Sequence, residues 1–459
     1  MNIRTDLTPA SVRAKAARVF ELSAAKIWSI DKDDVPGNAT PVFTVRGKYT
    51  ARGWTEWTQG FVYGSAILQF DATGDETFLE LGRTRTIERM AHHITHIGVH
   101  DHGFNNVSTY GGLWRLMGEG RIPENARERD FYELALKCTG AVQAARWTRI
   151  ADGSGFIHSF NGPHSLFADT IRSLRALAVS HQLGHVLMGE KDAAISLLKR
   201  LIEHAKTTAE FAVFYGKGRD FYDIRGRVAH ESIFNTNDGS YRCPNSQQGF
   251  APFTTWTRGL AWIVTGFPEQ LEWLDTRQDA ELEPFGGRAA VEAWMLEAAK
   301  AACDFYIDEA AAADGIPYWD TGAPELHRLG AWRERVAEPF NDFEPVDSSA
   351  AAIAAQGLLR LGRWLAARGR TGEGLRYTNA GLTVVNALFD TPYLSEDANH
   401  QGLVLHSVYH RPNGWDYIPP GQKVPCGESS MWGDYHAREL AVQVMRLADG
   451  GPYLTFFGK

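Results

Sequence analysis

The sequence repeats one helical pattern, in which an apolar helix is followed by a short turn containing glycine and then by a more polar helix. Three copies are "AILQFDATGDETFLELGRTRTIERM", "AVSHQLGHVLMGEKDAAISLLKRLIEHA" and "LLRLGRWLAARGRTGEGLRYTNAGLTVV". The glycine in each turn suits a helix C-terminus, where a left-handed backbone is needed. Helical hairpins repeated every 50–60 residues or so predict either an open solenoid or a closed ring.

Apolar periodicity predicts helices along most of the chain, and strand signals are few. The expected helices lie near residues 9–29, 58–73, 75–95, 125–147, 165–187, 190–213, 254–275, 285–308, 346–367, 370–390 and 428–447. A twelfth is expected in a poorly patterned stretch.

Two features favour a closed ring over an open solenoid. The first helix of each hairpin is apolar nearly all round, which indicates burial on both sides. The long loops between hairpins are rich in Trp, Gly, Asp and His, and a ring would gather them at one end. We therefore predict an all-α (α/α)₆ barrel with a pocket at one mouth. No Pro/Ser-rich linker divides the chain, so residues 1–459 are predicted to form a single domain.

Charge and cysteine usage exclude several classes of function. The net charge is −8 and no basic run occurs, which argues against a nucleic-acid partner. The four cysteines form no CxxC pair, so neither a disulfide framework nor a thiolate metal site is indicated. The N-terminus lacks a signal-peptide core and no apolar run is long enough to span a bilayer. We expect a cytoplasmic protein that does not contact membranes.

Aromatic residues are abundant and often stand beside Gly, Asn, Asp or His. The chain has 14 Trp, 15 Tyr and 24 Phe, and examples are "ARGWTEWTQGF", "PYWDTG" and "NGWDYIPPG". Aromatic faces beside hydrogen-bonding groups suit sugar rings, which have apolar faces and a polar rim. The alternative is that these residues fill a large core.

The first candidate for chemistry is Asp169, within "NGPHSLFADTIRSLRAL". On a helical wheel it falls on a small, partly polar stripe beside an apolar face, as expected for an inner helix facing the barrel cavity. A buried carboxylate is costly unless it is satisfied, so it is kept either for chemistry or in a structural pair. The structural alternative is a surface pair of Asp169 with Arg172 at i,i+3.

The second candidate is Asp101, in "VHDHGFNN". His100, Asp101 and His102 resemble metal ligands, but adjacent side chains point in different directions and no second cluster completes a site. A carboxylate at a loop mouth can instead act as a catalytic acid or base. The alternative is an aspartate that caps a turn or helix.

The third candidate is "NSQQGFAPFTTWTRGLAW", which contains Gln248, Trp256, Arg258 and Trp262. Arg258 could receive a carboxylate as a bidentate partner, or could hold a structural aspartate. The two tryptophans are six residues apart and would not share one face of a helix.

These stretches, in this order, resemble the unsaturated glucuronyl hydrolases, glycoside hydrolase family 88, and their rhamnogalacturonyl relatives. The matching landmarks are "WTQGF", "HDHGF", "FADTIRSL", "HAKTT", "QGFAPFTTWTRGLAW", "GIPYWD", "DSSAAAIAAQGLLRL" and "SSMWGDYHARE". They cover most of the chain between about residues 55 and 445. The family fold is an (α/α)₆ barrel, in agreement with the hairpin pattern.

The resemblance implies a specific reaction. The family acts on small oligosaccharides left by polysaccharide lyases, whose non-reducing end is a uronate with a C4=C5 double bond. The enzymes hydrate this vinyl ether: an acid protonates C4, water adds at C5, and the resulting hemiketal opens and expels the rest of the sugar. No metal and no cofactor is implied, and a homo-oligomer is compatible with the pattern.

The resemblance also implies roles for residues. Asp169 matches the general acid/base, with a raised pKa, and Asp101 matches the second aspartate, which orients substrate. Substrate-contacting positions are matched by Trp57, His230, Gln248, Trp256 and Trp262, whereas Phe160 stands near a family tryptophan and Gln247 replaces a histidine.

Three alternatives stay open at this point. One is a saturated uronidase, and a second is a sugar epimerase that would pair His100 or His102 with His230 as two bases. The third is a non-catalytic sugar-binding barrel, in which Asp101 and Asp169 would face solvent or be salt-bridged without a shared cavity.

Overall fold

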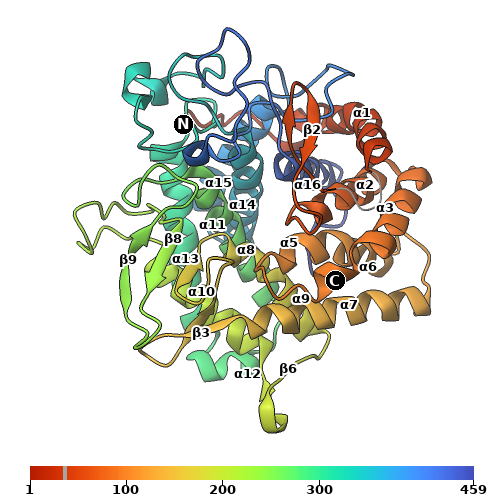
Figure 1. Ribbon diagram of the computed structural model, residues 1–459, viewed down its shortest axis with the longest axis vertical. Coiled ribbons are helices and arrows are strands. Elements are labelled where there is room, and N and C mark those ends of the chain that lie inside the picture. The colour runs from red at the N-terminus through yellow and green to blue at the C-terminus, as the bar shows by residue number, and fades with distance from the viewer. Residues whose placement is uncertain (35–38, 459) are drawn as a thin grey trace.

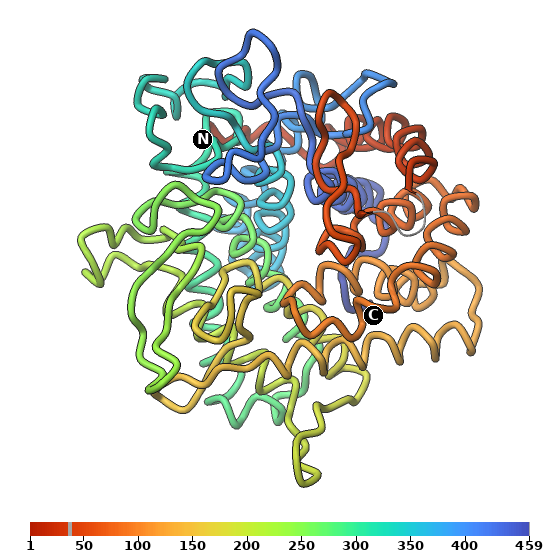
Figure 2. The backbone as a smooth tube through the Cα atoms, in the orientation of Figure 1, coloured from red at the N-terminus to blue at the C-terminus, as the bar shows by residue number. Residues whose placement is uncertain are grey.

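The computed structural model describes residues 1–34 and 39–458, which form a barrel of helical hairpins around a common axis (Figure 1). The chain winds once around this axis from its red N-terminal helices to its blue C-terminal helix (Figure 2). The inner segments are α2 (Gln59–Thr73), α5 (His102–Asn106) with α6 (Gly112–Gly118), α8 (Thr170–Ser173) with α9 (Arg175–Gln182), α11 (Thr257–Leu274), α14 (Ser348–Ala367) and α16 (Met431–Ala448). The outer helices are α1 (Pro9–Asp33), α3 (Glu76–Arg89), α7 (Ala126–Ala145), α10 (Leu197–Phe211), α13 (Arg288–Phe305) and α15 (Thr371–Leu388).

The inner segments close a ring. Going round, α2 packs on α5, α5 on α8, α8 on α11, α11 on α14, α14 on α16, and α16 on α2 again. Each inner segment also packs on its own outer helix, as α14 does on α15 and α2 on α3. The fold is therefore the (α/α)₆ barrel that the hairpin pattern predicted.

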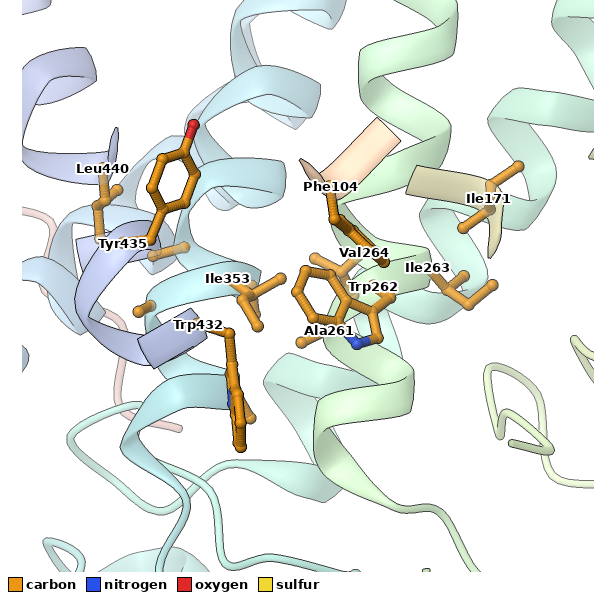
Figure 3. Close-up of a cluster of buried hydrophobic side chains, with 14 of the residues drawn as sticks. Phe104, Ile171, Ala261, Trp262, Ile263, Val264, Ile353, Trp432, Tyr435 and Leu440 are labelled. Atoms are coloured by element: carbon orange, nitrogen blue, oxygen red, sulfur yellow. The ribbon is translucent and has the colours of Figure 1, made fainter. Parts of the chain in front are cut away.

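Burial explains why the inner helices are apolar on every side. Every residue of α11 is buried, because the helix lies between α8, α14 and outer helix α13. Figure 3 shows Trp262 and Val264 of α11 with Ile353 of α14 and Trp432 of α16 in this core. Burying a large apolar side chain of this kind stabilises a fold by about 1.5–3 kcal/mol.

The predicted glycine turns are confirmed. Gly74, Gly184 and Gly369 follow α2, α9 and α14 with φ of 73°, 75° and 76°. Only glycine adopts this left-handed conformation without steric cost, so each glycine lets the chain reverse from an inner to an outer helix or hairpin.

Most predicted helices lie within a few residues of the observed ones, and the twelfth is the inner segment formed by α5 and α6. A π-helical turn, η1 (Val107–Gly111), joins these two helices. This segment contains Gly103, Gly111, Gly112 and two asparagines, all poor helix formers, so it has weak helical periodicity in the sequence.

Two predicted helices were wrong at their N-terminal ends. Residues 165–187 begin with a strand, β5 (Ser165–Phe167), before α8 and α9. Residues 190–213 begin in a protruding hairpin of β6 (Leu187–Met188) and β7 (Ala194–Ile195), and α10 starts only at Leu197. In the first case a short apolar run suits a buried strand as well as a helix. In the second case the residues before α10 are largely polar and exposed, so they have no apolar face to pack as a helix.

The remaining elements are short and lie between the helices. The strands are β1 (Pro41–Val45), β2 (Lys48–Ala51), β3 (Trp147–Arg149), β4 (Gly155–Ile157), β8 (Glu231–Phe234) and β9 (Tyr241–Asn245), and the short helices are α4 (Ala91–Ile94) and α12 (Asp279–Leu282). Strands β5, β8 and β9 form an antiparallel sheet in that order. Among the described residues, no helix is both long and apolar enough to cross a membrane.

Candidate active site

Asp169 is placed by the three-stranded sheet. Phe167, the last residue of β5, pairs with Glu231 of β8, and the amide of Ala168 donates to the carbonyl of His230 at 2.9 Å. Asp169 follows at once, as the residue that precedes α8. The helical-wheel argument for a polar stripe through Asp169 was therefore wrong, because the preceding residues are a strand and Asp169 lies at a strand-to-helix turn.

Asp101 is placed by a close approach of α5 to α8. A Cβ atom on Gly103 would lie 2.1 Å from the carbonyl oxygen of Ser173, so only glycine fits between these segments. The hydroxyl of Ser173 donates to the carbonyl of His100 at 2.6 Å and accepts from the amide of Gly103 at 3.0 Å. Gln143 of α7 donates to the same carbonyl at 2.7 Å. These bonds fix the residues of "HDHGF" against the start of α8.

The two aspartates and His100 meet in one group, which we call the mouth cluster. His100 Nε2 lies 3.3 Å from Asp169 Oδ1 and 3.8 Å from Asp101 Oδ1. All three side chains are buried, with His100 only 1% exposed. Within residues 1–34 and 39–458, His100 is the only cationic side chain that pairs with either carboxylate. The predicted alternative of an Asp169–Arg172 pair was wrong, because Arg172 donates to Glu269 and Glu439 instead.

The charged groups of the mouth cluster shift each other's pKa values. Burial opposes a charge on His100, but the carboxylates of Asp101 and Asp169 outweigh it and raise the pKa of His100. Burial raises the pKa of Asp101, and the positive charge of His100 offsets only part of that rise. Burial acts in the same direction on Asp169, yet the charge of His100 prevails and lowers the pKa of Asp169. The expected raised pKa of Asp169 was therefore wrong, and the raised pKa belongs to Asp101.

The mouth cluster lies on the wall of a cavity of about 340 Å³. This volume is within the range of small-molecule sites. The lining residues are Gly53, Thr55, Glu56, Trp57, His96, Val99, His100, Asp101, Phe160, Phe167, Asp169, Gln248, Trp256, Arg258 and Trp262. Every residue that the sequence assigned to the site is among them except His230.

His230 lies behind the cavity wall. Its ring packs 4.6 Å from that of Trp256 and 4.5 Å from that of Phe167, which both line the cavity. Its Nδ1 accepts from the amides of Gln247 and Gln248 at 3.1 and 3.3 Å, and burial lowers its pKa to about 4. The neutral ring thus holds the loop that carries Gln248, rather than facing the cavity.

Arg258 is an anchor for Gln248. Its guanidinium pairs with Asp347 at 2.9 Å, donates to the carbonyls of Val408 and Tyr409, and donates to Gln248 Oε1 at 3.0 Å. Of the two alternatives for Arg258, the contacts match the arginine that holds a structural aspartate. Because the amide oxygen of Gln248 faces Arg258, its Nε2 group can donate to an acceptor in the cavity.

Aromatic side chains form the other walls. Trp57 stacks on Trp432 with ring centres 5.1 Å apart, and Trp262 packs 4.9 Å from Phe104 (Figure 3). Trp256 precedes α11 with extended backbone, so the helical spacing between Trp256 and Trp262 does not apply. Both tryptophans line the same cavity, contrary to the expectation from that spacing.

Sequence reasoning left seven of the lining residues out of the predicted site, among them Glu56, Phe167 and His100. Glu56 precedes Trp57, and burial raises the pKa of Glu56. Phe167 was taken for the apolar face of a helix, although as part of β5 it reaches the cavity. His100 was weighed only as a metal ligand or a base. His100 directly precedes Asp101, and Gly103 of the same motif must be a glycine. This pattern could have placed His100 in the site.

The geometry weighs against two of the alternatives. Both ring nitrogens of His102 are engaged, Nδ1 with Thr139 at 2.6 Å and Nε2 with the carbonyl of His96 at 3.0 Å. His230, the second base in either proposed pair, does not line the cavity, which weighs against a two-histidine epimerase site. A non-catalytic barrel predicted aspartates without a shared cavity, whereas Asp101 and Asp169 share one. Among the described residues, no group of three or more His, Cys, Asp and Glu could hold a metal ion.

Comparison with known proteins finds relatives that match most of the chain. No protein-family model matches the chain. An unsaturated glucuronyl hydrolase from Bacillus sp. (strain GL1) is 26% identical over 413 residues, which are 88% of this chain and 90% of that protein. This relative supports the resemblance to the unsaturated glucuronyl hydrolases that the sequence motifs indicate.

Other similar proteins extend the likeness over nearly the whole chain. An unsaturated chondroitin disaccharide hydrolase from Streptococcus pyogenes serotype M1 is 23% identical over 92% of this chain and 88% of its own. The crystal structure of an unsaturated glucuronyl hydrolase specific for heparin superimposes with a TM-score of 0.71, with 18% identity, over 97% of this chain and 100% of that one. This structural neighbour has the same barrel fold as the chain.

Proposed function

We propose that the chain is a glycoside hydrolase that removes a Δ4,5-unsaturated uronyl residue from the non-reducing end of a small oligosaccharide. The observation that carries the proposal is the mouth cluster: two buried carboxylates that share one aromatic-walled cavity and have a histidine, not an arginine, between them. Related proteins named for chondroitin disaccharide and heparin support a uronyl oligosaccharide as substrate.

The proposed reaction is a hydration of the vinyl ether. Asp169 gives its proton to C4, and the positive charge that develops at C5 is shared with the ring oxygen. Water then adds at C5 and returns a proton to Asp169, so the carboxyl group acts first as acid and then as base. The hemiketal at C5 opens, and the glycosidic oxygen leaves with the rest of the sugar.

The mechanism needs a proton on the carboxyl pair when substrate binds. The substrate's own carboxylate brings a further negative charge into the cavity, and a like charge raises the pKa of nearby acids. We propose that the Nε2 group of Gln248 donates to this carboxylate, because its oxygen is already held by Arg258. The tryptophans Trp57, Trp256 and Trp262 would enclose the sugar ring.

We further propose that residues 1–459 act as one catalytic domain. All four cysteines are free thiols, which suits a reducing compartment, and we therefore propose the cytoplasm as the location.

The test is the loss of ultraviolet absorbance from unsaturated disaccharides of the chondroitin and heparin types. The wild-type protein should remove the conjugated double bond, and Asp169→Asn should slow this by at least ~10²-fold, the scale of general acid–base catalysis. Asp192→Asn, on the exposed hairpin between β6 and β7, is the matched control and should keep wild-type activity. Absorbance that persists with wild-type protein on every such disaccharide would overturn the proposal.

A further inference from the structure

His100 stands between the two carboxylates in a way that no structural need explains. Its Nε2 faces Asp169 Oδ1 at 3.3 Å and Asp101 Oδ1 at 3.8 Å, and neither ring nitrogen has another hydrogen-bond partner among the described residues. The neighbouring His102, on the same motif, has both ring nitrogens satisfied by Thr139 and a backbone carbonyl. Buried polar groups without ordinary partners are rare and call for a functional explanation.

The position of His100 is rigidly defined. The carbonyl oxygen of His100 accepts hydrogen bonds from the side chains of Ser173 and Gln143, and these bonds hold the backbone that carries the ring. Its imidazole packs parallel to Phe160 at 6.0 Å and edge-on to Phe167 at 5.5 Å. The imidazole therefore cannot turn freely away from the carboxylates.

The other titratable groups around His100 leave it as the nearest cation to Asp169. Arg146, at the end of α7, donates to the carbonyls of Ile97, His158 and Ser159. His102, His158 and His204 are the other imidazoles around His100, and burial lowers their pKa values to about 3, 4 and 3. They are neutral near pH 7, and so is His230, whose ring packs against Phe167.

We propose that His100 is a positioning residue that stays protonated between Asp101 and Asp169 and stabilises the Asp169 carboxylate formed when C4 is protonated. This inference rests on the proposed hydration. When the proton leaves Asp169 for C4, a negative charge appears on Asp169, and a cation already in place at 3.3 Å meets it without reorganisation. When water adds at C5, its proton returns to Asp169, and His100 keeps its own Nε2 proton throughout.

In this arrangement, Asp101 keeps His100 protonated. A lone buried imidazole would be neutral, because burial disfavours its charge. The second carboxylate, next to His100 in the chain, keeps the ring protonated even when Asp169 carries its own proton. With His100 between Asp101 and Asp169, a buried imidazolium, and not an arginine, supplies the positive charge next to the reacting carboxyl group of Asp169.

The first test is the pH dependence of kcat/KM for His100→Gln, whose amide can still donate a hydrogen bond but carries no charge. We expect kcat to fall about 10²-fold, the scale on which one preorganised donor at a developing negative charge is lost. The alkaline limb of the profile should move upward by about one pH unit, since removing a nearby cation raises the pKa of Asp169. A change in rate with no movement of either limb would contradict the proposal.

The second test does not depend on activity or on the folding of that variant. Ring ¹⁵N chemical shifts report whether His100 is an imidazolium. The wild-type protein should show a protonated His100 at pH 7, and Asp169→Asn and Asp101→Asn should each make it lose its proton at lower pH. A neutral His100 at pH 7 in the wild-type protein would overturn the inference. If the wild-type protein hydrates no unsaturated disaccharide but His100 is protonated, the proposed function fails and the charge arrangement stands.

Discussion

Two groups of buried charges lie one helical turn apart along α8, and they are built differently. In the mouth cluster, two aspartates share one histidine and face a cavity. One turn deeper, Arg172 pairs with Glu269 at 3.0 Å and with Glu439 at 2.7 Å, and Arg175 approaches Glu439 at 3.6 Å. We call Arg172, Arg175, Glu269 and Glu439 the axial ion network.

Trp262 lies close to both groups. It lines the cavity, and the guanidinium of Arg172 lies 6.0 Å from its ring centre. In the axial ion network, each carboxylate has an arginine partner. In the mouth cluster, the carboxylates have only His100 as a cationic partner among the described residues, and they line the cavity. The degree of pairing, more than burial, distinguishes a structural carboxylate from one that can do chemistry.

The largest expected effect is on the axial ion network. Arg172→Met would leave Glu269 and Glu439 buried without their main partner, which destabilises a protein by about 3–5 kcal/mol. Urea denaturation should show this loss in the free energy of unfolding. The control Arg13→Met removes an exposed pair with Asp449 and should leave the unfolding midpoint unchanged. An unaltered midpoint for Arg172→Met would mean that the network is not what holds α8, α11 and α16 together.

A smaller effect is expected at the rim of the cavity. Phe160 is 50% exposed, lines the cavity and packs against His100. Phe160→Ala should lower kcat/KM for an unsaturated disaccharide by about tenfold, the worth of one aromatic contact of about 1–1.5 kcal/mol. The control is Phe131→Ala on outer helix α7, where the ring is 40% exposed and does not line the cavity. Equal effects of the two substitutions on kcat/KM would remove Phe160 from the site.

The smallest effect is that of Asp101→Asn on stability, and its sign should be opposite to that of the larger effect of Glu439→Gln in the axial ion network. The pKa of Asp101 is raised in the fold, so ionising it costs stability, and that cost appears as the pH rises through its folded pKa. The pKa of Glu439 is lowered by Arg172 and Arg175 against the effect of burial, so its contribution is present above the unfolded pKa and is lost as the pH falls.

Asp101→Asn should therefore raise the melting temperature at pH 7.5 and lose this advantage in acid. Glu439→Gln should lower the melting temperature at pH 7.5, because it leaves Arg172 and Arg175 short of a partner. Thermal melts across pH check both signs. A fall in melting temperature at pH 7.5 for both variants would show that Asp101 is a structural carboxylate like Glu439.

The sequence alone was enough for the barrel and for most of the cavity wall. Apolar periodicity and the glycine turns predicted the hairpins, since burial on both sides leaves an apolar pattern all round an inner helix. Trp57 and Gln248 were assigned to the site by the resemblance to the family, and the cavity at one end of the barrel includes both residues. Apolar periodicity and turn glycines are local features of the sequence. The barrel fold brings them together, because it gathers the long loops at one end.

What could not be predicted depends on contacts between distant segments. The strand before Asp169 forms because β8, more than sixty residues later, pairs with it. The raised pKa predicted for Asp169 was wrong, since the position of His100 relative to both oxygens is set by Gly103, Ser173 and Gln143 on three different elements. Arg258 likewise finds Asp347 only in the folded chain.

The central claim is that the mouth cluster adds a proton to C4 of an unsaturated uronide, and the reaction in D₂O tests it most directly. The wild-type protein should place one carbon-bound deuteron at C4 of the released uronyl fragment, seen by NMR soon after mixing, at the same rate as the ultraviolet absorbance disappears. Release of the sugar with no deuteron on carbon, or with the double bond still intact in the first product, would contradict the account.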